Sequence, residues 1–169
     1  MIREYGPIPL IPAAWTLMFL TVVYPGVDPY WIKHMHLFML VFLGFFAVAS
    51  GHQMTDKVMK AWRNIIAVGF FFTALGTAGF YLTQYQEILS LTVILYWFIA
   101  PAYGFKITSE SIERYSELYS NLRYFSFLAV LAFAAGESLK IRVLTGAGLI
   151  TAAAVQLISI ILASKLDHE

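Results

Sequence analysis

The chain contains no cysteine and few charged residues, and both features restrict what it can be. Without cysteine there are no disulfides, no thiolate metal ligands and no cysteine nucleophiles. Charged residues make up 12% of the 169 residues, against roughly 25% in soluble domains, and 60% are hydrophobic. The net charge of +1 provides no electrostatic footprint for nucleic acid, so we exclude nucleic-acid binding. The composition therefore indicates a membrane protein in contact with the lipid bilayer.

Sequence motifs of common enzyme classes are also missing from the chain. It has no glycine-flanked serine nucleophile, no H-E-x-x-H zinc motif, no phosphate-binding glycine loop and no aspartate-rich pair for a prenyl or phospholipid transferase. The centres of the apolar segments carry no ionisable side chain, which argues against an ion-coupled pump or a voltage sensor. Catalysis is the least supported class of function, and we expect a protein that is not an enzyme on its own.

Six apolar segments predict six membrane-spanning helices. The segment from Trp31 to Ser50 covers roughly 30 Å as a helix, which matches the hydrocarbon core of a bilayer. The predicted spans are residues 8–24, 31–50, 62–84, 88–105, 119–136 and 143–164. Gly51 would end the second span, and Thr55 with Asp56 would cap the start of the third. We therefore predict one all-α transmembrane domain over residues 1–169, with an N-terminus that is not a cleaved signal.

Pro101 and the polar segment after it define the expected end of the fourth span. Proline lacks a backbone N–H and its ring clashes with the preceding turn, so Pro101 would kink or end the helix nearby. In residues 106–123, Ile112, Tyr115, Tyr119 and Leu122 share one helical face. We predict a cytoplasmic amphipathic helix at the membrane interface between the fourth and fifth spans.

The positive charges predict the orientation of this topology. With a cytoplasmic N-terminus, eight of the 11 lysines and arginines lie in the cytoplasm. Lys33, Lys140 and Arg142 are then the three on the outside. This bias predicts a multi-pass protein of the cell (inner or plasma) membrane with both termini in the cytoplasm.

Two of the predicted helices carry small residues on one face. These are Gly69 and Gly76 in the third span and Gly148 and Ala152 in the sixth. Small residues let two helix backbones approach closely, which is how helices associate inside a membrane. We predict that both faces pack against other helices.

A first candidate site lies on the outer face, where helix ends carry His34, His36, Glu87 and Glu137. Imidazole and carboxylate groups from separate helices could hold a divalent metal ion or relay protons, but polar residues at the interface are ordinarily solvated, and that is the simpler interpretation. Haem is a further alternative cofactor, although the histidine spacing does not supply two facing axial ligands.

A second candidate site lies inside the membrane. Thr73, Thr77, Tyr96 and Gln156 are polar residues near the centres of the third, fourth and sixth spans. If small residues draw these helices together, the four side chains could surround an apolar pocket for a neutral or amphipathic solute.

Three functions are consistent with these features. The first is a non-catalytic integral subunit or anchor of a larger membrane assembly, which contacts a protein partner or a second copy of the chain. The second is a small-molecule binding or facilitator protein that uses the interior pocket. The third is a metal- or haem-binding redox protein that uses the outer histidines and glutamates.

Overall fold

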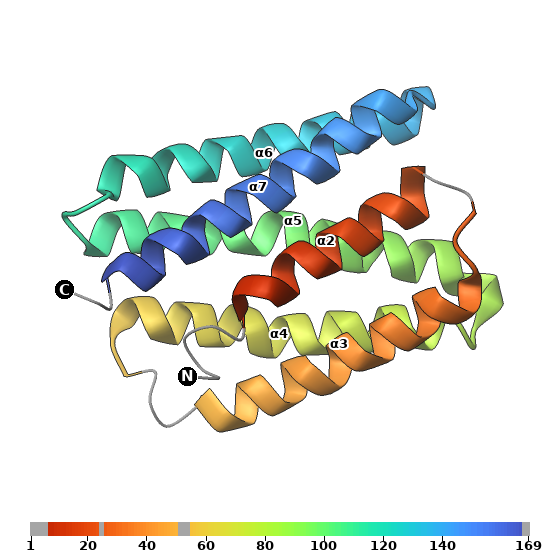
Figure 1. The fold of residues 1–169 in the computed structure, drawn as a ribbon, viewed down its shortest axis with the longest axis horizontal. Coiled ribbons are helices and arrows are strands. Elements are labelled where there is room, and N and C mark those ends of the chain that lie inside the picture. Colours follow the sequence, from red (N-terminus) through yellow and green to blue (C-terminus); the bar gives the residue numbers. More distant parts are fainter. Residues whose placement is uncertain (1–6, 24–25, 51–54, 167–169) are drawn as a thin grey trace.

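The computed structural model describes residues 7–23, 26–50 and 55–166, and the regular structure in these ranges is entirely helical. The elements in chain order are α2 (Pro7–Val23), α3 (Pro29–Ser50), α4 (Lys57–Gly79), η1 (Thr83–Tyr85), α5 (Gln86–Ser111), α6 (Ser116–Leu139) and α7 (Arg142–Leu166) (Figure 1). The helices α3 to α7 are long and apolar enough to cross a membrane. α2 has 17 residues and is a shorter apolar helix of about 25 Å. This set of apolar helices suggests a membrane-embedded protein.

The helices form an incomplete ring. Each helix packs mainly on its neighbour in the order α3, α4, α5, α6, α7, α2. α2 thus packs on the last helix of the chain, and in Figure 1 it lies between α7 and α3. Although α2 and α3 are consecutive in the sequence, they contact each other little over their described residues. The ring is therefore open between α2 and α3.

The main hydrophobic core lies where α2, α5, α6 and α7 meet. Its buried residues are Trp15, Phe98, Ala129, Phe133, Leu149 and Ala152. The rings of Trp15 and Phe98 meet edge to face, with 5.1 Å between their centroids. This core attaches α2 to the α5–α6–α7 part of the ring.

Glycines bring the backbones of α6 and α7 into contact. A Cβ atom on Gly136 would lie 2.3 Å from the backbone nitrogen of Thr145, and one on Gly148 would lie 2.7 Å from that of Phe133. Overlap with backbone atoms cannot be relieved by rotating a side chain, so these two positions require glycine. Gly148 belongs to the small-residue face of the sixth predicted span, and Gly136 is an additional contact point.

α4 packs on α5 through glycines that face large side chains. A Cβ atom on Gly69 would lie 2.6 Å from the ring of Trp97, and one on Gly76 would lie 2.6 Å from Cγ2 of Val93. The two helices are joined by a short connection that contains η1, so they form an antiparallel hairpin. The small-residue face of α4 is therefore in contact with α5 of the same chain.

The ends of α3 and α4 differ in detail from the predicted ends. Asp56 caps α4 as predicted, because the backbone N–H of Met59 donates to its carboxylate at 2.9 Å. This cap starts α4 at Lys57 rather than at residue 62, and the helix ends at Gly79 rather than at residue 84. The predicted end at Gly51 lies outside the described residues.

The segment 106–123 is not a separate interfacial helix, and this prediction was wrong. α5 continues past Pro101 to Ser111, the chain is extended at Ile112, and α6 begins directly after Tyr115, which has a left-handed backbone conformation. The residues expected to rest on lipid headgroups instead pack inside the protein, since Tyr119 and Leu122 are buried with Phe105, Val155 and Leu162. The apolar face that the sequence pattern had assigned to the membrane surface is therefore buried against other helices of the protein.

Candidate ligand-binding cavity

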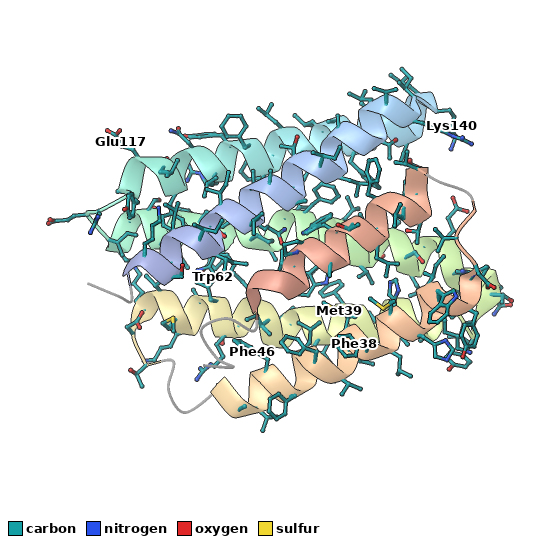
Figure 2. All side chains as sticks on the ribbon, in the orientation of Figure 1. Phe38, Met39, Phe46, Trp62, Glu117 and Lys140 are labelled. Carbon is teal, nitrogen blue, oxygen red and sulfur yellow. The ribbon has the colours of Figure 1, made fainter. Side chains whose placement is uncertain are left out.

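A cavity of about 330 Å³ lies within the incomplete ring, and we call it the ring cavity. Residues of α2, α3, α4, α5 and α7 line it. From α3 come Met39, Phe42 and Phe46, whose spacing of three and four residues places them on one face of the helix. Figure 2 labels Met39 and Phe46 on this helix. The wall opposite α3 is formed by side chains of α2, including Ala14 and Trp15.

Gln156 of α7 forms hydrogen bonds to two other helices, and a third bond extends this network to α4. The indole N–H of Trp15 on α2 donates to Gln156 Oε1 at 3.0 Å. Gln156 Nε2 donates to the backbone carbonyl of Trp97 on α5 at 2.9 Å. The indole N–H of Trp97 in turn donates to Thr73 Oγ1 on α4 at 3.2 Å. This network holds α2, α7, α5 and α4 in register around the cavity.

The hydrogen bond to Trp97 explains how α5 continues through Pro101. In a regular helix the carbonyl of Trp97 would accept from the N–H four residues later, at position 101, but proline has no N–H. Gln156 Nε2 supplies the missing donor from the neighbouring helix. In an apolar environment an unpaired carbonyl is costly, and a side chain of a neighbouring helix is one way to satisfy it. Of the two expected effects of Pro101, a kink or an end of the helix, the end near residue 105 was wrong, because α5 continues to Ser111.

His36 and two residues of α5 add polar groups near the connection between α4 and α5. His36, Gln86 and Ser90 all line the ring cavity. The Nδ1 atom of His36 lies 3.0 Å from the backbone carbonyl of Ile32, and its ring meets Phe80 edge to face. A carbonyl can only accept, so the neutral ring carries its proton on Nδ1 and can accept a hydrogen bond at Nε2.

The structure distributes the four predicted interior residues over different places. Thr73 and Gln156 line the ring cavity. Thr77 donates to the Thr73 carbonyl within its own helix at 2.8 Å and is not part of the lining. Tyr96 lines a separate groove between α4 and α5, and its hydroxyl donates to the carbonyl of Ile65.

Trp15 and Trp97 were not among the predicted site residues, although both line the cavity. A signal for Trp97 does exist in the sequence, because it stands four residues before Pro101 and its carbonyl must therefore find another donor. The sequence contains no comparable signal for Trp15, because its contact with Gln156 spans 141 residues of the chain.

The outer-face candidates do not form one metal site. Within residues 7–23, 26–50 and 55–166, no group of three or more histidine, aspartate or glutamate side chains could hold a metal ion. His34 is exposed, with Nδ1 lying 2.7 Å from the carbonyl of Tyr30. Glu137 accepts from the hydroxyl of Thr145 at 3.0 Å, and Glu87 is an exposed residue in the first turn of α5. Of the four candidates, only His36 lines the ring cavity.

Comparisons with protein-family models, with curated proteins and with solved structures found no match. Over the described residues, the helices and the cavity define an all-helical protein that is suited to a membrane and has a partly open, mainly apolar cavity between its helices. Its function is therefore argued from the residues of this chain.

Proposed function

We propose that this chain is an integral membrane protein that binds a neutral, amphipathic small molecule in the ring cavity. The observation that carries the proposal is the cavity itself, which has a volume of about 330 Å³ and a mainly apolar lining with a few polar groups. Protein interiors are close-packed, and voids larger than a water molecule are few. Binding sites for small molecules typically start at roughly 300 Å³ and combine apolar walls with a small number of polar groups.

The lining favours a ligand without a net charge. It includes no lysine, arginine, aspartate or glutamate among the described residues. A buried ion without a partner would be strongly disfavoured, so an anion or a cation does not suit this cavity. His36, Gln86 and Ser90 offer hydrogen bonds near the connection between α4 and α5, and the methionines and phenylalanines of α3 offer apolar contact. A molecule with one polar end and an apolar body matches this distribution.

The opening of the ring suggests a route for such a ligand. α2 and α3 both line the cavity but contact each other little in their described parts. A molecule dissolved in the bilayer could enter sideways between these two helices without passing through water. Only a few residues connect the end of α2 to the start of α3, so these two ends must stay close together. The start of α2 and the end of α3 are the parts that could move apart.

We further propose that all six helices span the membrane and that both termini lie in the cytoplasm. The positive-inside count of the sequence supports this orientation. α2 is shorter than the hydrocarbon core, and a short helix can be accommodated by local thinning of the bilayer. Localisation in the cell membrane follows from the same proposal.

Photolabelling of the full-length chain with a diazirine-bearing hexadecanol tests the proposed cavity. Ala14 lines the cavity, whereas its neighbour Ala13 is exposed, so Ala14→Phe and Ala13→Phe form a matched pair on one helix. Met39 and Leu43 both line the cavity, and we expect mass spectrometry to locate the label on them in the wild type and in Ala13→Phe. In Ala14→Phe, the new ring occupies the cavity and labelling of these residues should fall to background.

Two outcomes would overturn the proposal. One is equal labelling of Met39 and Leu43 in both variants. The other is a label spread over lipid-facing residues such as Val41 and Val48 with no excess at the cavity. If the labelling instead supports the proposal, the natural ligand can be identified by comparing organic extracts of the purified wild type and of Ala14→Phe.

A second candidate function is the subunit or anchor of a larger membrane assembly, and the exposed face of α3 favours it. Phe38, Val41, Phe45 and Val48 recur at spacings of three and four residues and are between 54% and 81% exposed. The glycine faces of α4 and α7 are already occupied within the chain, which leaves the exposed face of α3 as a candidate contact surface. Native mass measurement in mild detergent tests it, because a dimer or a bound protein that is lost in Val48→Ser would support this function. A monomer that carries a small molecule would support the first proposal instead.

A further inference from the structure

A second hollow, of about 720 Å³, lies between α4 and α5 and shares no lining residue with the ring cavity. We call it the lysine groove. Lys57 and Lys60 line it from the first turns of α4, and Asn64 and Val68 continue the same face of that helix. From α5 the groove is lined by residues that include Ala100 and Tyr103. It combines a cationic end with a remainder of apolar side chains, one asparagine and two tyrosines.

The length of the lysine groove matches one leaflet of a bilayer. The rise from Lys57 to Val68 is about 17 Å at 1.5 Å per residue, and half of the hydrocarbon core is about 15 Å. Small side chains form its base, since Ala61 is buried and Ala100 is half-buried, and the exposed ring of Tyr103 stands beside them. A hydrocarbon chain could therefore lie along the groove from its cationic end toward the middle of the membrane.

The charge at the end of the groove is available to an external anion. Neither Lys57 nor Lys60 forms an ion pair with another described residue, whereas Lys106 nearby on α5 is paired with Glu110 at 3.9 Å. Both lysines are exposed. They also stand in the first turn of α4, where the unpaired backbone N–H groups of a helix favour negative charge. Asp56 uses its carboxylate to cap this same helix.

From this complementarity of charge and length we propose that the lysine groove is a binding site for an anionic phospholipid. The phosphate of the headgroup lies at Lys57 and Lys60, and one acyl chain lies over Ala61 and Ala100. The two lysines stand on the side that the positive-inside count assigns to the cytoplasm, where anionic lipids attract basic residues. This site is independent of the proposed ligand of the ring cavity.

Lipid titration of the purified full-length chain in detergent tests the proposal. The probes are phosphatidylglycerol, phosphatidylcholine and inorganic phosphate, and the readouts are the melting temperature and the lipid retained in native mass spectra. We expect phosphatidylglycerol to bind and to raise the melting temperature more than phosphatidylcholine does. In Lys57→Gln/Lys60→Gln the affinity for phosphatidylglycerol should fall about five-fold for each lysine removed.

The control pair is Lys140→Gln/Arg142→Gln, which removes two positive charges at the opposite end of the helices and should leave phosphatidylglycerol binding unchanged. Ala100→Trp fills the base of the groove without changing charge, and it should weaken phosphatidylglycerol binding as well.

The proposal is overturned if phosphatidylcholine binds as tightly as phosphatidylglycerol, or if the control pair loses as much affinity as the lysine pair. It is also overturned if inorganic phosphate alone gives the same stabilisation, because the site would then recognise an anion and no lipid.

Discussion

At the scale of single residues, Gln156 supplies the hydrogen-bond donor that Pro101 lacks. Pro101 removes the backbone donor that would satisfy the Trp97 carbonyl, and Gln156 provides a donor from α7 at 2.9 Å. The other end of the same amide accepts from the Trp15 indole at 3.0 Å. Within the described ranges no buried side-chain polar atom lacks a partner, which is the arrangement that an apolar environment requires. Gln156 is thus a structural link as well as part of the cavity wall.

Gln156→Leu should lower the free energy of unfolding by about 1–3 kcal/mol, because it leaves the Trp15 indole N–H and the Trp97 carbonyl without partners. In a Pro101→Ala background the loss should be smaller by about 1 kcal/mol, since the alanine supplies its own N–H to the Trp97 carbonyl. Unfolding in mixed micelles measures both values. Ser164→Ala is the control, at a half-buried position on the same helix whose hydroxyl donates to the Ile161 carbonyl within that helix, and it should change little. If the stability changes of Gln156→Leu and Pro101→Ala add up to that of the double variant within about 0.5 kcal/mol, the two residues do not act together.

At the scale of elements, glycines decide how closely the helices approach. The contact of α6 with α7 places backbone against backbone at Gly136 and Gly148. The contact of α4 with α5 places glycine against a large side chain, as at Gly69 and Trp97. A flexible side chain can move aside and a backbone cannot, so the two contacts should differ in their tolerance to substitution.

Gly148→Ala should destabilise the protein by about 1–3 kcal/mol, because its Cβ would lie 2.7 Å from the Phe133 nitrogen. Gly79→Ala is the matched control, since a Cβ at that position would lie 3.4 Å from its nearest atoms and make ordinary contact. Thermal unfolding of both variants in the same detergent measures the difference. Equal melting temperatures would mean that α6 and α7 separate more easily than their packing indicates.

At the scale of the whole molecule, the ring is held together by neighbours that are distant in the sequence. α2 packs on α7, which closes the core on one side, and its weak contact with α3 leaves the cavity open on the other. Lys140 lies at one end of α6 and Glu117 at the other (Figure 2), so the proposed topology places these two residues on opposite sides of the membrane. The proposed orientation can be tested directly because the chain has no cysteine of its own.

Single cysteines introduced by Arg3→Cys, Glu113→Cys and Lys140→Cys report the side of the membrane on which each position lies. With six spans and cytoplasmic termini, a membrane-impermeant maleimide should label only Lys140→Cys in intact cells. The other two should react only after permeabilisation. Labelling of Arg3→Cys from outside would mean that α2 does not span, and labelling of Glu113→Cys from outside would reverse the orientation of α5 and α6.

The sequence by itself determined the helical class and the approximate number and position of the apolar helices. Hydrophobic runs of this length can satisfy their backbone groups in a bilayer only as helices, so local composition suffices for that conclusion. Local signals also predicted the cap at Asp56, because a side chain and an N–H three residues apart decide it. The small-residue faces of α4 and α7 could likewise be read from helical spacing.

Only the tertiary structure decided which of these helices are neighbours and what lies between them. The sequence pattern could not show that α2 packs on α7 or that Trp15 reaches Gln156, since such contacts depend on the fit of surfaces far apart in the chain. The same reason explains why the helix does not end near residue 105 and why the segment 106–123 does not form a separate helix. A donor from α7 satisfies the carbonyl that the proline leaves free, and a buried cluster takes up the apolar face that was expected at the membrane surface. α2 packs on α7 and contacts its sequence neighbour α3 little, and the ring cavity lies between the helices arranged in this way. No local sequence pattern encodes which helix α2 packs on.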